Sequence, residues 1–258
     1  MHKRNAMTEA YVKSEISGKT QVIEFFHPSS NSLPGAILSD IANAITEAGK
    51  NDNARCILLK SRGDRAFCAG ASFDELVAIK DAEGGLEFFT GFAKVINAIR
   101  TCPKLVIGRV QGKAVGGGVG IASAVDYCFA TQHSAIKLSE LAIGIGPFVV
   151  GPAVERKMGK SAFTELAIDA SEWRSAEWAA QRGLYNYVGA DIAKMDAELS
   201  QFISRVEKYS PEAIGELKTI FWLGTEHWND LLVDRAKISG RLVLSDFTIN
   251  AINKFKSK

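Results

Sequence analysis

The sequence lacks the features that mark membrane and nucleic-acid-binding proteins. No apolar run reaches the length of about 18 residues that a membrane-spanning helix needs. The 31 basic and 29 acidic residues leave a net charge of only +2, which argues against nucleic acid or an anionic membrane as the main partner. This slight positive excess still suits an acidic metabolite.

Cysteine is scarce and shows no functional spacing. Cys56, Cys68, Cys102 and Cys128 form no C-x-x-C pair and have no histidine at zinc-site spacing. Three of them lie in or beside apolar runs, so we expect free, buried thiols and no metal. The N-terminal segment MHKRNAMTEA lacks the apolar core of a signal peptide. We therefore expect a cytoplasmic protein.

The common nucleotide-binding glycine patterns are also absent. The run Gly116–Gly118 continues as Val119, Gly120 and Ile121, which does not complete G-x-G-x-x-G, and no Lys-Ser/Thr pair follows. Dinucleotide and nucleoside-triphosphate binding are therefore disfavoured.

What the chain does contain is an alternation of strand-like and helix-like segments over its first two thirds. Hydrophobic residues make up 47% and charged residues 23% of the sequence, as in an ordinary globular domain. The alternation predicts βαβ units around a largely buried sheet. The expected strands are residues 22–26, 56–59, 105–110, 127–130 and 135–138, and the expected helices are residues 35–48 and 86–100.

After Pro147 we expect helices and no further strands. Ser210-Pro211 is a helix N-cap followed by proline at the first helical position. With no repeat or linker in the sequence, one continuous unit is expected, with a core over residues 1–195 and a helical region over residues 196–258.

The segment from Gly112 to Pro147 carries the strongest chemical signal. Its glycine run lies at a strand-to-helix turn, where free backbone N–H groups favour negative charge. One isolated carboxylate, Glu140, follows before an apolar, glycine-rich stretch. An oxyanion on these N–H groups and a base beside it would perform proton chemistry on a carbonyl compound.

A second turn, Arg62 to Leu76, follows the strand that ends near Lys60. It contains two glycines, and Ser72 is placed to cap the following helix. Alone it indicates only a turn. Together with the glycine run it offers two backbone N–H groups from separate turns, the minimum for an oxyanion hole.

These motifs together resemble the crotonase (enoyl-CoA hydratase/isomerase) superfamily. The resemblance rests on Arg65-Ala66-Phe67-Cys68-Ala69-Gly70-Ala71, on Gly116–Gly118, on Ser139-Glu140 with Gly144 and Pro147, and on residues 175–184, in the family's order. Asn31-Ser32-Leu33 and Phe247 extend it over nearly the whole chain.

The resemblance implies an α/β fold, a spiral of ββα units with a helical C-terminal trimerisation region, as a homotrimer or dimer of trimers. It implies a coenzyme A thioester as substrate and no prosthetic group. It also implies Ala71 and Gly117 as oxyanion-hole donors and Glu140 as the catalytic base. The positions it assigns to coenzyme A binding are Arg65, Ala69, Ala71, Ser72, Phe73, Gly117 and Phe247.

Departures from the family pattern bear on the reaction. Family hydratases hold a water between two glutamates, and here the first of these positions is Gly120. A single base suffices to move a double bond, so the resemblance is closest to the enoyl-CoA isomerases. The alternatives are a hydratase or other lyase with a non-standard second group, such as Asp74 or Glu75, and a non-catalytic acyl-CoA-binding subunit.

Two further expectations concern the surroundings of these positions. An apolar pocket of Ile143, Ile145, Phe148 and Val149 is expected to raise the pKa of Glu140 by desolvation. Gly120 has two open interpretations, close helix packing or space for a bulky acyl group.

Overall fold

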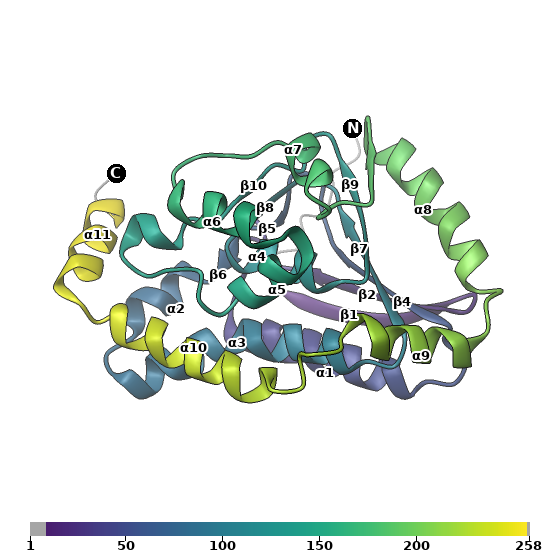
Figure 1. Ribbon diagram of the computed structural model, residues 1–258. Helices are drawn as coiled ribbons and strands as arrows, with labels where there is room; N and C mark the ends of the chain where they lie inside the picture. The colour runs from purple at the N-terminus through teal and green to yellow at the C-terminus, as the bar shows by residue number, and fades with distance from the viewer. Residues whose placement is uncertain (1–8, 257–258) are drawn as a thin grey trace.

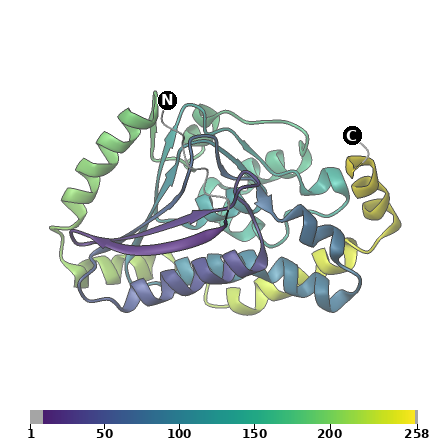
Figure 2. The ribbon, with the colours of Figure 1, turned by 180° about the vertical axis from the view of Figure 1, so that it is seen from behind.

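A six-stranded sheet forms the centre of the molecule in the computed structural model, which describes residues 9–256 (Figure 1). Its order is β1-β2-β4-β7-β9-β11, and only the β1–β2 pair is antiparallel. Figure 2 shows the β1–β2 hairpin lying over α1. The strands are β1 (Tyr11–Ser17), β2 (Thr20–Phe26), β4 (Cys56–Ser61), β7 (Leu105–Val110), β9 (Tyr127–Thr131) and β11 (Tyr187–Gly189).

Two small sheets carry the turns that the sequence singles out. Their orders are β10-β8-β5 and β3-β6, with parallel pairing throughout. The segment from Arg62 to Leu76 contains β5 and β6, and the glycine run begins directly after β8, which ends at Val115. These strands are β3 (Ser32–Leu33), β5 (Ala66–Cys68), β6 (Gly70–Ala71), β8 (Lys113–Val115) and β10 (Ile136–Lys137).

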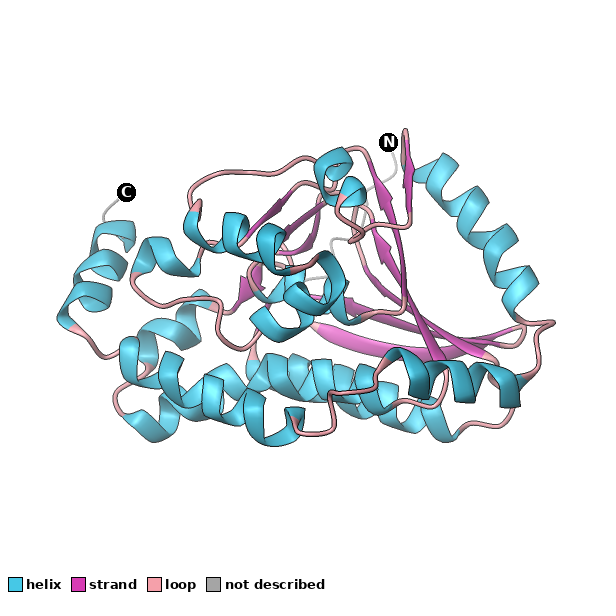
Figure 3. Cartoon of the chain, in the orientation of Figure 1, coloured by secondary structure: helices cyan, strands magenta, loops and turns pink. Residues whose placement is uncertain are grey.

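Helices cover both faces of the main sheet (Figure 3). In β4, Ile57 and Leu59 join the large core that includes α1 and α3, whereas Cys56 and Leu58 pack with α8 and α9. Burial on both faces explains why residues 56–59 of this strand are continuously apolar. The helices are α1 (Gly35–Lys50), α2 (Phe73–Ala78), α3 (Ala82–Thr101), α4 (Gly117–Ala124), the 3₁₀ helix η1 (Glu140–Ile143), α5 (Gly151–Met158), α6 (Lys160–Ile168), α7 (Ala176–Gln181), α8 (Ile192–Val206), α9 (Pro211–Phe221), α10 (Trp228–Leu242) and α11 (Asp246–Lys256).

The longer predicted elements are confirmed, since all five strand windows and both helix windows coincide with or overlap observed elements. The expectation of no strand after Pro147 is wrong, because β11 pairs in parallel with β9. Three residues are too few to show alternation, so only the neighbouring strand defines β11. The helical C-terminal region is confirmed. The boundary at residue 195 stays a prediction, and α8 crosses it.

Local signals read from the sequence are also confirmed. Ser210 Oγ accepts a hydrogen bond from Ala213 N–H at 3.3 Å, and Pro211 begins α9. The four cysteines are free and buried. Within the described residues, no helix is long and apolar enough to cross a membrane. Most of the N-terminal segment judged for a signal peptide lies outside the described residues.

Candidate active site

A mostly apolar cavity of about 240 Å³ opens where the two turns meet η1. We call it the Glu140 cavity, since of the described residues that line it Glu140 alone is titratable. Its lining residues are Ser32, Ala69, Gly70, Ala71, Phe73, Leu76, Phe88, Phe89, Phe92, Val115, Gly116, Gly117, Ser139, Glu140, Ile143, Ile145, Gly146, Pro147, Phe148, Val149, Val150 and Ser239.

The first turn is held by β3. Ser72 N–H donates to the carbonyl of Leu33 at 3.0 Å, and Ser32 Oγ donates to the carbonyl of Ala71 at 2.8 Å. The backbone N–H groups of successive residues in an extended strand point to opposite sides. Since the N–H of Ser72 points to β3, the N–H of Ala71 points away from it. Gly70, with φ +95°, makes the bend that this arrangement needs.

The second turn places the start of α4 against the cavity. Gly116 has φ +51°, and its N–H donates to the carbonyl of Lys137 at 2.9 Å. The N–H of Gly117 lies in the first turn of α4, where no intrahelical acceptor exists. A Cβ at Gly117 would lie 2.1 Å from the Phe92 ring, so only glycine fits there. Gly117 and Ala71 both line the cavity.

Glu140 is the first residue of η1 and places its carboxylate beside the second turn. A Cβ at Gly116 would lie 2.8 Å from Glu140 Oε1, so the glycine makes room for the carboxylate. Although the residue as a whole is only partly buried, its Oε2 is buried and has no hydrogen-bond partner. Desolvation raises the pKa of Glu140 to about 7, opposed by a hydrogen bond from its own backbone N–H.

The apolar surroundings predicted for this carboxylate are confirmed. Ile143, Ile145, Phe148 and Val149 all line the cavity with Glu140. Withdrawal from water among such side chains disfavours the ionised form, which is the cause of the raised pKa. A carboxylate with a pKa of about 7 can both accept and return a proton near neutral pH.

Gly120 decides between the two interpretations left open. It is fully buried in α4, and a Cβ at this position would lie 2.5 Å from Val150 Cγ1 and 2.8 Å from Val150 Cβ. The interpretation as acyl space is wrong, because Val150 fills that volume and Gly120 does not line the cavity. Close packing accounts for the glycine.

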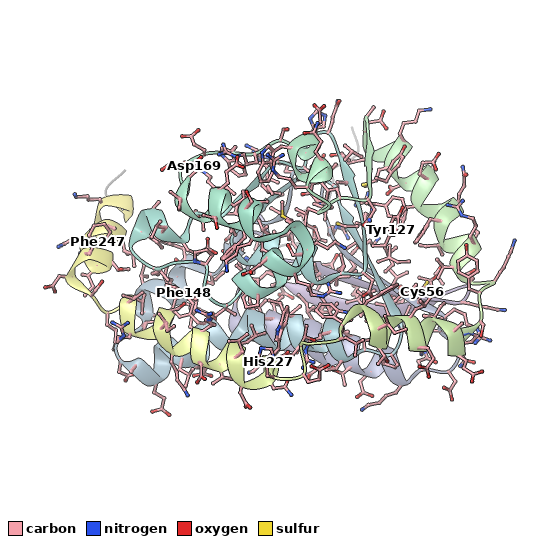
Figure 4. The ribbon with its side chains drawn as sticks, in the orientation of Figure 1. Cys56, Tyr127, Phe148, Asp169, His227 and Phe247 are labelled. Atoms are coloured by element: carbon pink, nitrogen blue, oxygen red, sulfur yellow. The ribbon has the colours of Figure 1, made fainter. Side chains whose placement is uncertain are left out.

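The remaining predicted residues divide into two groups. Ala69 and Phe73 line the cavity, and Ser72 beside them caps α2, accepting from Glu75 N–H at 3.3 Å. Arg65 is exposed and does not line the cavity. Phe247 lies on the outlying α11 and is 67% exposed, with its ring over Gly144 (Figure 4). Their part in coenzyme A binding stays a prediction.

Neither acid considered as a second catalytic group reaches the cavity. Asp74 is exposed in the first turn of α2. The side chain of Glu75 is occupied elsewhere, since its Oε2 accepts from Gly35 N–H at 2.9 Å.

An aromatic wall supplied by α3 is part of the site although none of the sequence motifs includes it. Phe88, Phe89 and Phe92 line the cavity, and the first two meet edge to face with centroids 5.0 Å apart. Their spacing places them on one side of a helix, which was visible in the sequence. That this side faces Glu140 depends on how α3 packs under α4.

Comparison with known proteins identifies the family. Structurally, the chain resembles an enoyl-CoA hydratase from Bacillus halodurans, with a TM-score of 0.86, 19% identity and coverage of 95% of this chain and 99% of the other. The fold is therefore the crotonase fold. The family model described as enoyl-CoA hydratase/isomerase matches residues 15–234. The chain belongs to this family.

Relatives in the family carry names for different reactions. The Bacillus subtilis protein YngF, named for enoyl-CoA hydratase/isomerase, is 30% identical over 179 residues, 68% of each chain. A trans-2-decenoyl-(acyl-carrier-protein) isomerase of Streptococcus mutans is 25% identical over 217 residues, 81% of each chain. Membership thus makes this chain an enzyme of the family without fixing its reaction.

Proposed function

We propose that this enzyme converts a 3-enoyl-CoA into the conjugated 2-enoyl-CoA with Glu140 as its single base. The observation that carries the proposal is the absence of a second acid among the described residues lining the cavity, together with the filling of the Gly120 position by Val150. Adding water requires a group to place the water as well as proton transfer, whereas moving a double bond requires one base.

The proposed reaction needs only a proton shuttle and an oxyanion site. Glu140 removes a proton from C2, and the electrons of that bond pass into a dienolate whose oxygen lies on the N–H groups of Ala71 and Gly117. The same carboxyl group returns the proton to C4, so no atom is gained or lost. Gly116 directly precedes the proposed donor Gly117, so Glu140 lies beside the proposed oxyanion site. This position supports the pathway, because the C2 proton lies close to the thioester oxygen bound at that site.

The oxyanion donors account for much of the proposed catalysis. Loss of one such donor in comparable sites costs about 2.7–4 kcal/mol in the transition state. Both proposed donors are backbone groups, held by the β3–β6 pairing on one side and by the Gly116–Lys137 hydrogen bond on the other.

The rate is expected to follow ionisation of the base. Because the pKa of Glu140 is about 7, kcat/KM for isomerisation should fall about tenfold for each pH unit well below 7 and level off above it. A flat profile between pH 5 and 8, at rates limited by chemistry, would contradict the assignment of this base.

A direct assay tests the proposal. The protein is incubated with a 3-enoyl-CoA and, separately, with a 2-enoyl-CoA, while the absorbance of the conjugated thioester is followed. We expect conjugation to increase with the first and to stay unchanged with the second. Loss of conjugation from the second would assign a hydratase, and binding without reaction in either would assign an acyl-CoA-binding subunit.

The trimeric assembly is part of the same proposal. Leu217, Ile220, Phe221 and Leu223, on α9 and just after it, are each about half exposed or more, at 47–65%. Such a surface is larger than scattered single residues and suits burial against another copy. Sedimentation equilibrium at micromolar concentration tests it, with the monomer mass as the contradicting result.

A further inference from the structure

A second cavity, of about 300 Å³, adjoins the Glu140 cavity on the far side of the Gly146–Phe148 segment. We call it the distal cavity. The two cavities share Gly146, Pro147 and Phe148 as lining residues. Five further apolar side chains line the distal cavity from η1, α5 and α6, namely Leu141, Pro152, Phe163, Ala167 and Ile168.

The partition between the cavities includes the side chain of Phe148. Its ring lies against Gly146, where an added Cβ would be 2.7 Å from two ring atoms. Phe148 N–H donates to the carbonyl of Gly146 at 2.8 Å, so the backbone folds back on itself at this point. The residue is half-buried and outside any helix. A side chain of this kind can change rotamer without moving a helix.

The distal cavity exposes apolar surface that a ligand would cover. Ile168 is 67% exposed and Leu141 is 48% exposed, and both line it. Its two charged lining residues, Glu155 and Arg235, are of opposite sign and leave no net charge. An uncharged, apolar ligand therefore suits this cavity better than an anion.

We propose that the distal cavity receives the far end of a long, apolar acyl chain, which passes from the Glu140 cavity when the Phe148 ring moves aside. The inference rests on the proposed function, because it assumes that the thioester lies at Ala71 and Gly117. Size supports it, since the Glu140 cavity alone is smaller than most small-molecule sites, whereas the joined space falls within their usual range of about 300–1,000 Å³.

The test measures binding of saturated acyl-CoA thioesters, from butanoyl to tetradecanoyl, by titration calorimetry. Each methylene group buried in an apolar site tightens binding about fourfold, from about 0.8 kcal/mol per group. For the wild-type protein we expect the affinity to keep increasing with each added methylene group up to the long acyl chains. In Ala167→Phe, where the new ring fills the distal cavity, we expect the gain to stop at intermediate length.

Two further variants complete the experiment. Ala193→Phe makes the same substitution at an exposed position of α8, outside both cavities, and should bind the whole series like the wild type. Phe148→Ala removes the partition and should tighten binding of the longest chains. Thermal unfolding of each variant verifies that it is folded.

Two results would overturn the inference. The first is an Ala167→Phe profile that matches the wild type at every chain length. The second is a wild-type affinity that stops increasing with chain length at short chains and does not increase further for longer chains in Phe148→Ala. If the first result is accompanied by a change in the sedimentation of Ala167→Phe, the cavity is assigned to a contact between copies.

These results also separate the inference from the function on which it rests. If short saturated thioesters bind and a short 3-enoyl-CoA is isomerised normally while the long-chain effects are absent, only the distal cavity loses its assignment. If no acyl-CoA of any length binds, the proposed function fails as well.

Discussion

The carboxylates of Asp126 and Glu140 are both withdrawn from water, but their surroundings are opposite. The side chain of Asp126 is 4% exposed, and it accepts hydrogen bonds from Lys218 Nζ at 2.6 Å, Val106 N–H at 2.7 Å and Trp222 Nε1 at 3.2 Å. Glu140 Oε2 is buried with no partner. Three groups from other residues donate to Asp126, whereas Glu140 has a hydrogen bond from its own backbone N–H and keeps Oε2 without a partner.

The difference separates a structural carboxylate from a reactive one. Asp126 connects the end of α4 to β7 and α9, because its partners come from those elements. A carboxylate that already accepts three hydrogen bonds, one of them from a lysine, has little capacity left for a substrate proton. Glu140 keeps that capacity. Its raised pKa reflects the free-energy cost of burying an ionised carboxylate that has an oxygen without a partner.

The sharpest test of this contrast is Glu140→Gln. The amide cannot accept the C2 proton, so we expect kcat for isomerisation to fall about 10²–10⁴-fold, the usual contribution of a positioned general base. Steady-state kinetics with a 3-enoyl-CoA measures it. Glu87→Gln, an exposed change on α3 outside the cavity, is the control and should leave kcat unchanged. Near-wild-type activity in Glu140→Gln would remove it as the base.

Asp126→Asn should instead cost stability. Lys218, 3% exposed, would keep its buried charge without a counter-ion. Removing one partner of a buried pair costs about 3–5 kcal/mol in the free energy of unfolding, which urea denaturation measures. The double variant Asp126→Asn/Lys218→Met removes the stranded charge and should recover part of the loss. If the single variant is as stable as the wild type, the network does not hold α9.

The pH dependence of stability should differ between wild type and Glu140→Gln. With a pKa of about 7 in the folded protein against 4.5 ordinarily, Glu140 binds more protons when folded between these values. Its contribution to stability is therefore present below pH 4.5 and is lost as pH rises through 7. The free energy of unfolding of Glu140→Gln minus that of the wild type should therefore be on the order of 1–3 kcal/mol larger at pH 8 than at pH 4. A difference independent of pH would contradict the burial of this carboxylate.

Gly120→Ala should give the smallest effect. The new methyl group would overlap Val150, and overpacking of this kind costs about 1–3 kcal/mol. The better helix propensity of alanine offsets up to about 1 kcal/mol. Urea denaturation checks the balance, and Gly120→Ala/Val150→Ala should restore the lost stability. A stabilised single variant would mean that Val150 does not occupy this space.

Much of the fold was predictable because its signals are local. The strand 105–110 matches β7, and the caps Ser72 and Ser210 accept the hydrogen bonds expected of them. Each depends on a few neighbouring residues, such as an apolar run or a hydroxyl three positions before a free N–H. Short strands such as β3, β6 and β11 exist only through partners distant in sequence, so no local pattern marked them.

For the site, the sequence by itself determined which chemical groups are present: two glycine turns, one carboxylate at position 140 and no acid at position 120. Tertiary structure alone decided that Glu140 Oε2 has no partner, that Val150 fills the space at Gly120 and that Phe148 lies between two cavities. The physical reason is that desolvation and packing depend on which side chains from remote segments surround a group, and those neighbours are brought together only by the fold.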